Sequence, residues 1–365
     1  MQSPTILIPG IQGTKLINVN SLHFDTIWSA VQSRYENIFD LELTPDTRFD
    51  VSPGVLIERG DVEDLAYRES VIILEHKIRS PVFIFGYDWR KSCAENGKRL
   101  KALVDYLREK LCTRRFNFLT HSMGGMVFSC YLRELGGDYD VIEHAVLTVC
   151  PFLGAVDALI GLIVGEGGSK FPLFNSNDEF RKIARSFPSV YELCPVYPDA
   201  VSFAAGEDFD LFDPDHWQSN ISNFPIFRER IAGLKSFRQP QAPAMFPLSL
   251  LPRQVKERFL ILAAEGEQTN IKAVVYPKDP AGRVSNYFDF CRDKGEGDGT
   301  VPLVSATAFK EEVLTLVVES KWYDKATHSL FLNDGRVQSV ISRFLKCDTA
   351  YPRWWSDIGC TVRKA

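Results

Sequence analysis

Residues 116–125 read FNFLTHSMGG, an apolar run that leads to a serine and a pair of glycines, and a helical pattern follows directly. A serine on a sharp turn between a strand and a helix has its hydroxyl pushed out of the sheet, close to the N–H groups of the first helical turn. Gly124 and Gly125 allow the helix to pass close to the strand. Thr120 stands where the usual G-x-S-x-G motif has its first glycine. The stretch therefore predicts a slightly unusual nucleophile elbow that displays Ser122.

Around the elbow, compact runs rich in Val, Ile and Phe alternate with helical patterns. This alternation is typical of a mostly parallel sheet covered by helices on both faces. The predicted strands are residues 5–8, 82–85, 116–120, 145–150, 259–263 and 313–318. Together with the elbow, their order predicts an α/β-hydrolase fold.

Two apolar stripes predict helices that cover the sheet. The first has the spacing i, i+3, i+4, i+7 and i+11 and consists of Leu100, Leu103, Val104, Leu107 and Leu111. The second consists of Val337, Val340, Ile341, Phe344 and Leu345. Asn333 or Asp334, just before the second stripe, is a suitable N-cap for that helix.

The alternation of strands and helices fails between about residues 151 and 252, where Gly, Pro and Phe are dense. A structureless loop of that length is improbable in a compact domain, so we expect helices and turns over the mouth of the sheet. The predicted organisation is a core in two parts, residues 1–150 and 256–365, with an inserted cap of residues 151–255. Two apolar cap segments, residues 155–164 and 244–251, either line an acyl tunnel, touch a bilayer as a peripheral membrane contact, or pack in the core.

Composition excludes several classes of function and names no partner. The 365 residues carry a formal net charge of -5 and contain no basic run, so no general attraction to nucleic acid is expected. The longest apolar segment, residues 155–165, contains Asp157 and is too short for a transmembrane helix. Met1 is followed almost at once by a predicted strand, so we expect no leader peptide and a cytoplasmic location.

The cysteines lack the spacing of a zinc site or a redox motif, since no two are close in the sequence. They are Cys93, Cys112, Cys130, Cys150, Cys194, Cys291, Cys347 and Cys360. We interpret most of them as free buried thiols, and we expect neither a metal nor a cofactor.

A base for Ser122 is sought among the histidines, because α/β-hydrolases place the nucleophile, the acid and the histidine in that order. His144, His216 and His328 follow Ser122 in the sequence. His144 directly precedes a predicted strand, and His216 lies in the cap. His328 comes after the last strand and just before the closing helix, so it can return to the carboxyl edge of the sheet. It is the preferred base.

The acid is expected on a glycine-rich turn, GEGDGTVP at residues 295–302, which carries Asp298. We prefer it to Asp289 and Asp293. A serine hydroxyl attacks poorly until a neutral imidazole takes its proton, and the carboxylate holds the imidazole in one tautomer. The oxyanion that develops needs two backbone donors. We expect the N–H groups of Met123 and, from the loop after the first strand, Ile11.

Four motifs in this order resemble the lecithin:cholesterol acyltransferase-like lipases, which include lysosomal phospholipase A2 and the phospholipid:diacylglycerol acyltransferases. The motifs are ILIPGIQGTKL at residues 6–16, YDWR at 87–90, HSMGG at 121–125 and GDGTVP at 297–302. The resemblance implies a triad of Ser122, Asp298 and His328, an oxyanion hole formed by the Ile11 and Met123 amides, and acyl-ester lipids as substrates. The acyl group would pass to water or to an alcohol.

Other interpretations remain for each feature. Ser122 could occupy an ordinary turn, Asp298 could only cap a glycine-rich turn, and His328 could be a structural histidine. His121 is interpreted as a packing or hydrogen-bonding residue, and residues 88 and 90 as an ion pair under the site. Rival functions are a thioesterase or small-ester esterase on the same fold, and a catalytically silent binding module.

Overall fold

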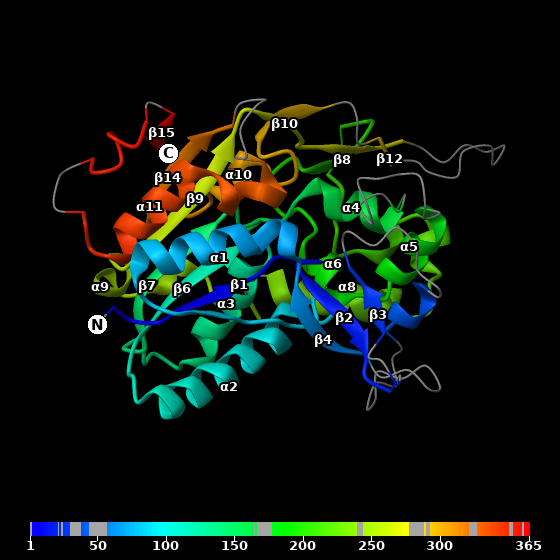
Figure 1. Ribbon diagram of the computed structural model, residues 1–365. Helices are drawn as coiled ribbons and strands as arrows, with labels where there is room; N and C mark the ends of the chain where they lie inside the picture. The colour runs from blue at the N-terminus through cyan, green and yellow to red at the C-terminus, as the bar shows by residue number, and fades with distance from the viewer. Residues whose placement is uncertain are drawn as a thin grey trace.

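The computed structural model describes residues 2–20, 22, 25–29, 38–43, 57–163, 165, 177–206, 208–238, 244–276, 288–289, 293–320, 327–349, 353–359 and 361–365. A seven-stranded sheet runs through its centre (Figure 1). Its order is β15 (Val362–Lys364), β14 (Leu314–Glu319), β9 (Phe259–Glu265), β7 (Ile142–Thr148), β6 (Phe116–His121), β1 (Thr5–Ile8) and β5 (Val82–Ile84). All neighbours pair in parallel except β15, which runs antiparallel to β14.

The mostly parallel sheet confirms the predicted α/β fold. All six predicted strands are present, and the largest difference is in the fourth, which begins at Ile142 and not at residue 145. The central strands β1, β6 and β9 are almost entirely buried on both faces, which is why their sequences are mainly apolar.

Helices cover both faces of the sheet. On one face α1 (Asp64–Ile78) and α11 (Gly335–Leu345) share an apolar cluster with strand residues such as Leu119. On the other face α2 (Cys93–Leu111) and α3 (Gly124–Glu134) share an apolar cluster with the preceding residue of the same strand, Phe118. Successive strand residues point to opposite faces, so each strand joins the two clusters.

Both predicted helices are present, with a difference at one end. Asp334 is the N-cap of α11, and its carboxylate accepts the N–H groups of Arg336 and Val337. In α2 the predicted apolar stripe is buried at Leu100, Val104 and Leu107, but Leu111 is exposed.

The cap region is mainly helical, as expected. It contains α4 (Val156–Ile163), α5 (Asn177–Ala184), α6 (Pro188–Glu192), η2 (Pro214–His216), α7 (Ser219–Ser222), α8 (Phe227–Arg238), η3 (Leu248–Leu250) and α9 (Arg253–Lys256). Figure 1 shows α4, α5, α6 and α8 gathered beyond the carboxyl ends of the parallel strands. The apolar residues of α4 are buried, so this segment packs in the interior. Leu250 is 66% exposed, and membrane contact by the second apolar segment stays a prediction.

One strand in the cap was not expected. β8 (Val201–Phe203) pairs with β11 (Ala273–Val275), which also pairs with β12 (Phe288–Asp289). The remaining elements are a sheet of β2 (Thr14–Asn18), β3 (Thr26–Trp28) and β4 (Ile57–Val62), the pair β10 (Glu267–Asn270) and β13 (Lys294–Gly297), α10 (Leu303–Ala306), and the short helices η1 (Ile38–Leu41) and η4 (His328–Asn333). The division into a core and a cap at residues 150 and 255 remains our interpretation.

A buried carboxylate joins the cap to the core. Glu192, at the end of α6, accepts the N–H of Cys93 at 2.7 Å and the hydroxyl of Ser92, so it caps the N-terminus of α2. Burial raises the pKa of this carboxyl. Arg238, at the end of α8, donates to the Glu192 carbonyl at 3.0 Å. The two cap helices are therefore tied to the helix beneath them through hydrogen bonds that are shielded from water.

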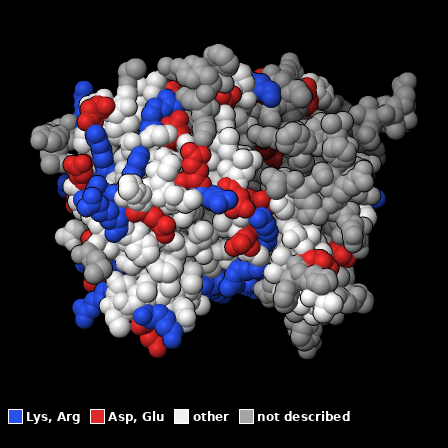
Figure 2. All heavy atoms as spheres, viewed as in Figure 1, with Lys and Arg blue, Asp and Glu red and all other residues white. Residues whose placement is uncertain are grey.

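Among the six described cysteines, all are free, and Cys93, Cys130, Cys150 and Cys194 are buried. Cys112 and Cys347 are also free but exposed, in contrast to the buried thiols expected for most of the cysteines. Cys291 and Cys360 lie outside the described residues. In the described part of the chain no helix is both long and apolar enough to cross a bilayer. Figure 2 shows acidic and basic side chains interspersed over the described part of one face.

Candidate active site

Ser122 lies between the end of β6 and the start of α3, in the turn that the sequence predicts. Its φ is +54°, the left-handed region that costs a non-glycine residue about 1–3 kcal/mol. The surrounding structure holds it there, because the Ser122 N–H donates to the Thr148 carbonyl at 2.9 Å. A strained serine at a strand-to-helix turn is the geometry of a nucleophile elbow.

Two glycines make this turn possible. A Cβ at position 124 would lie 2.3 Å from the Ile8 carbonyl oxygen, so only glycine lets α3 approach β1 so closely. A Cβ at Gly125 would lie 2.5 Å from Cys150 Sγ and 3.2 Å from Thr120 Oγ1. The Thr120 side chain therefore lies over the bare Cα of Gly125. The second glycine of the pair explains why the elbow tolerates threonine at its first position.

The structure brings His328 and Asp298 to Ser122. His328 is the first residue of η4, and its Nε2 lies 2.8 Å from Ser122 Oγ. Its Nδ1 lies 2.7 Å from Asp298 Oδ2. All three residues are buried. With a carboxylate at Nδ1, the neutral ring carries its proton on that nitrogen, which leaves Nε2 free to accept the serine proton.

The Asp298 carboxylate is held in place by the turn that carries it. Its Oδ1 accepts the N–H groups of Thr300 at 2.9 Å and Val301 at 2.7 Å, so Oδ2 remains for the histidine. The alternative acids lie elsewhere: Asp289 is in β12, and Asp293 precedes β13. Of the carboxylates considered from the sequence, Asp298 is the one hydrogen-bonded to His328.

The other two histidines considered as bases belong to different surroundings. His144 lies within β7, and its Nε2 is 3.7 Å from Cys347 Sγ. His216 lies in η2 of the cap, and its Nδ1 accepts the Asp210 N–H. Neither has a recorded contact with Ser122 in the described part of the chain.

The loop after β1 runs past the elbow, as an oxyanion hole requires. A Cβ at Gly10 would lie 2.9 Å from Ser122 Cβ, which places the loop directly against the serine. Within the described ranges, the backbone N–H groups of Ile11 and Met123 donate to no other protein group. Both amides are therefore available to an oxyanion, although their assignment stays a proposal.

Asp88 and Arg90 form a buried ion pair, which confirms that part of their interpretation. Their closest N–O distance is 2.7 Å, and Arg90 also donates to the Leu41 carbonyl. Burial alone would raise the pKa of the Asp88 carboxyl, but the charge and hydrogen bonds of Arg90 outweigh it and lower that pKa. The pair is fully shielded, so it serves the structure and does not meet a substrate.

Sequence reasoning missed two tyrosines next to the site. The Tyr67 hydroxyl contacts both Gly10 and His121, and the Tyr87 hydroxyl donates to the Pro9 carbonyl. Tyr87 belongs to a motif that the sequence singled out, but Tyr67 lies in an ordinary helix with no motif around it. Only the fold brings its hydroxyl to the elbow.

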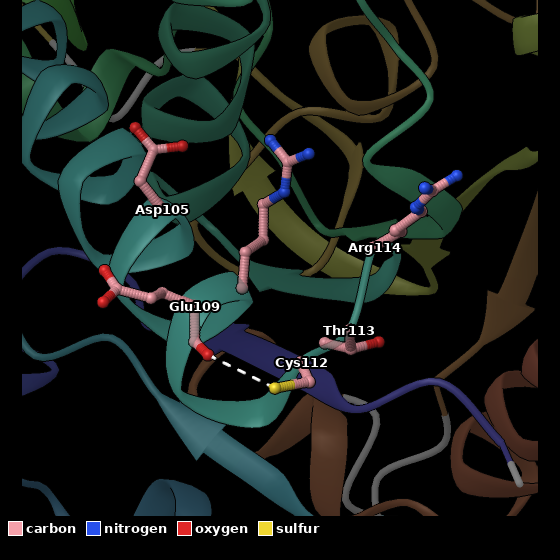
Figure 3. A pocket seen from close by; sticks show the side chains of 6 residues that line it. Asp105, Glu109, Cys112, Thr113 and Arg114 are labelled. Carbon is pink, nitrogen blue, oxygen red and sulfur yellow. Dashed lines mark hydrogen bonds between the residues drawn. The ribbon is translucent and has the colours of Figure 1, made fainter.

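A hollow of about 450 Å³ at the end of α2 is remote from this chemistry (Figure 3). Asp105, Arg108, Glu109, Cys112, Thr113 and Arg114 line it. Its wall is charged and it includes none of the triad, so it does not suit an acyl chain. No group of three His, Cys, Asp or Glu residues that could hold a metal occurs among the described residues.

Comparison with known proteins agrees with this geometry. Residues 78–226 match the family described as Lecithin:cholesterol acyltransferase. Phospholipase A(1) LCAT3 of Arabidopsis thaliana is 23% identical over 316 residues, which are 76% of this chain and 68% of that protein. The chain is therefore similar to this family over less than half of its length. The matched region includes Ser122 and ends before Asp298 and His328, so the latter two rest on the geometry above.

The fold of this chain has a solved counterpart. The crystal structure of the Tle4-Tli4 complex contains a chain that is 15% identical, with a TM-score of 0.63. The similarity covers 96% of this chain and 99% of that chain. At this identity the similarity shows the fold alone, and it extends through the cap region.

Proposed function

We propose that this protein is a serine-dependent hydrolase or acyltransferase of lipid acyl esters that acts through an acyl-Ser122 intermediate. The observation that carries the proposal is the hydrogen-bonded series Ser122 Oγ, His328 and Asp298, with distances of 2.8 and 2.7 Å. The strained φ of Ser122 and the free amides beside it support the same role.

In the first half of the reaction, Ser122 Oγ attacks the ester carbonyl while His328 Nε2 takes its proton. Asp298 stabilises the imidazolium that forms and does not itself become protonated. The Ile11 and Met123 amides stabilise the oxyanion. The imidazolium then gives its proton to the departing alcohol, and the acyl group remains on Ser122.

In the second half, the acceptor gives its proton to His328 and attacks the acyl carbon of the acyl-serine. The bond from that carbon to Ser122 Oγ then breaks, and His328 returns the proton to the serine oxygen. Water as the acceptor releases a fatty acid, and an alcohol as the acceptor forms a new ester. The same triad serves both outcomes, so the balance depends on whether an alcohol reaches the site in place of water. Hydrolysis requires no further binding site.

Lipid substrates are supported by the comparisons. The family description names an acyltransferase of lecithin and cholesterol, and the Arabidopsis relative is named a phospholipase A(1). A thioesterase or small-ester esterase would use the same triad, and a silent binding module would not need it. The intact series of hydrogen bonds disfavours the silent module.

Labelling by a fluorophosphonate probe tests the nucleophile. We expect the wild type to be labelled and Ser122→Ala to remain unlabelled. Ser129→Ala is the matched control, since Ser129 is buried in α3, the helix that follows Ser122, and its hydroxyl has no hydrogen-bond partner among the described residues. This variant should be labelled like the wild type. Equal labelling of Ser122→Ala would exclude Ser122 as the nucleophile.

Product analysis tests the substrate. A mixed panel of phospholipids and neutral lipids is incubated with and without a long-chain alcohol, and the products are identified by mass spectrometry. Fatty acid alone indicates a lipase, and a new ester indicates acyl transfer. Cleavage of thioesters or short esters without lipid cleavage would favour the alternative esterases, and no product would favour the silent module.

A further inference from the structure

The loop that carries Ile11 is folded around one buried hydroxyl group. The Gly10 N–H donates to Tyr67 Oη at 2.9 Å. A Cβ at Gly13 would lie 2.7 Å from the same oxygen, so the far end of the loop also passes directly beside it. Tyr67 is buried in α1, and its hydroxyl therefore occupies the centre of the loop.

Two tyrosines hold the peptide group between Pro9 and Gly10, one step before the peptide group that carries the Ile11 N–H. The Tyr87 hydroxyl donates to the Pro9 carbonyl at 2.8 Å, while Tyr67 accepts the N–H of Gly10, so the peptide group between residues 9 and 10 is held at both ends. In the next peptide group the Gly10 carbonyl accepts the Gly13 N–H at 3.1 Å. Because C=O and N–H point in opposite directions in a trans peptide, the Ile11 N–H points away from that bond.

The same hydroxyl reaches the base through His121. Tyr67 Oη lies 2.9 Å from His121 Nδ1, and His121 Nε2 lies 2.8 Å from the His328 carbonyl oxygen. A carbonyl only accepts, so Nε2 carries the proton and donates. Burial, and then the nearby His328, lower the pKa of His121 to about 3, so the ring is neutral near pH 7. Nδ1 therefore accepts, and the Tyr67 hydroxyl donates to it.

These contacts give one directed series of hydrogen bonds from Gly10 through Tyr67 and His121 to the backbone of His328. The His328 N–H in turn donates to the Asp298 carbonyl at 3.1 Å. Both backbone groups of the base are thus fixed, the N–H by the Asp298 carbonyl and the carbonyl by His121, which Tyr67 connects to the oxyanion loop. Tyr67 and His121 are both buried, and among the described residues the hydrogen bond to Ser122 Oγ comes from His328 and not from either of them.

We propose that Tyr67 and His121 are positioning residues that hold the Ile11 amide and the His328 imidazole at a fixed separation across Ser122. The inference rests on the proposed function, because it assigns a role within the same site. An oxyanion donor contributes only when it is preorganised, and small displacements reduce its effect strongly. Losing the Tyr67 hydroxyl should therefore slow the chemical steps and leave substrate binding unchanged.

The first test is Tyr67→Phe, measured with a soluble p-nitrophenyl acyl ester. We expect kcat to fall about tenfold to a hundredfold with KM within twofold, less than the loss of a whole oxyanion donor. Tyr131→Phe is the matched control, since Tyr131 is also a buried helical tyrosine but its hydroxyl has no hydrogen-bond partner. This control should retain the kcat of the wild type. If Tyr67→Phe does not fold, Tyr87→Phe replaces it with the same expected change.

A transition-state analogue separates positioning from general damage. An alkylboronic acid forms a tetrahedral adduct with a serine, and its anionic oxygen occupies the oxyanion hole. Its inhibition constant should rise in Tyr67→Phe by the same factor as kcat falls. A merely structural role would lower the melting temperature without this parallel change.

Two substitutions of His121 test the direction of the series. His121→Gln keeps a donor near the position of Nε2, facing the His328 carbonyl, and His121→Asn keeps an acceptor near the position of Nδ1, facing Tyr67. Each variant keeps one of the two hydrogen bonds of His121 and loses the other. If the series links the oxyanion loop to His328, both variants should have a lower kcat than the wild type. In the double variant of Tyr67→Phe and His121→Gln, the two losses should be less than multiplicative.

The proposal is overturned if Tyr67→Phe keeps its kcat within twofold, or if its kcat falls while boronic acid inhibition is unchanged. Multiplicative losses in the double variant would also overturn it. These outcomes differ from failure of the proposed function. In that case Ser122→Ala would keep wild-type labelling and activity, whatever the behaviour of Tyr67→Phe.

Discussion

Replacing Asp298 by asparagine should inactivate the protein without unfolding it. In the structure one carboxylate oxygen accepts the N–H groups of Thr300 and Val301, at 2.9 and 2.7 Å, and the other faces His328 Nδ1. An asparagine has a single acceptor oxygen. The two backbone donors claim that oxygen, so the amide NH₂ must turn towards His328.

The consequence for His328 is a change of tautomer. A ring nitrogen that faces an NH₂ group has to accept, so the proton moves from Nδ1 to Nε2, where it points at Ser122. The imidazole then cannot take the serine proton. This type of substitution lowers kcat by roughly 10⁴-fold, which corresponds to about 5 kcal/mol in the activation free energy.

Stability should change much less than activity. The asparagine keeps both backbone hydrogen bonds, and one charge-assisted bond is lost, worth about 1.5–3 kcal/mol. The assay compares kcat and the melting temperature of Asp298→Asn with those of Asp293→Asn, a carboxylate on the same segment away from His328. A kcat of Asp298→Asn within tenfold of the wild type would refute the argument, because the tautomer would then not depend on Asp298.

Three further substitutions test the fold around the site. Gly124→Ala should abolish soluble expression or labelling, because its Cβ would lie 2.3 Å from the Ile8 carbonyl oxygen; an active variant with an unchanged melting temperature would contradict this. Asp88→Asn leaves the buried Arg90 without its counter-charge and should lower the free energy of unfolding by about 3–5 kcal/mol in denaturant titration, whereas a loss below 1 kcal/mol would speak against the ion pair. Asp334→Ala removes the cap of α11 and should lower that free energy by about 1 kcal/mol at pH 7. Burial alone would raise the pKa of the Asp334 carboxyl, but Arg336 and the helix amides outweigh burial and lower that pKa. The stabilisation by this carboxylate is therefore present above the ordinary aspartate pKa and is lost as the pH falls through the lowered pKa of the folded protein. Unfolding of this variant and the wild type at pH 7 and in acid should show the difference shrinking, and a constant difference would contradict the shift.

The central strands and the elbow could be predicted from the sequence because each depends on local chemistry. A strand buried on both faces must be apolar throughout, and the elbow requires glycines where a helix crosses a strand. The positions of Ser122 and His328 follow from the topology, since they come after β6 and β14 of the parallel sheet, whereas Asp298 directly follows β13 of the antiparallel pair. Their contact could be anticipated because parallel strands all end at one edge.

Other features could not be predicted, because they depend on partners far along the chain. β8 has only three residues and is a strand because β11 pairs with it about seventy residues later. Tyr67 lies in α1 with no local signal, and its role arises only where its hydroxyl meets the β1 loop and His121. Leu111 continues the periodic apolar pattern of α2 but is 40% exposed, and a periodic pattern does not show where the packing on a helix ends.

The helix α1 positions both sides of the active site, although it supplies no member of the triad. Through Tyr67 it holds the β1 loop, and through Ser70 it holds the short helix of the base, since the Ser70 hydroxyl donates to Asn333 Oδ1 at 2.5 Å. The Asn333 side chain also donates to the Leu65 carbonyl at 3.0 Å. These contacts lie on successive turns of one rigid helix, so a displacement of α1 moves the oxyanion loop and the base together. The separation of the oxyanion loop and the base across Ser122 is therefore maintained, because both are hydrogen-bonded to the same helix.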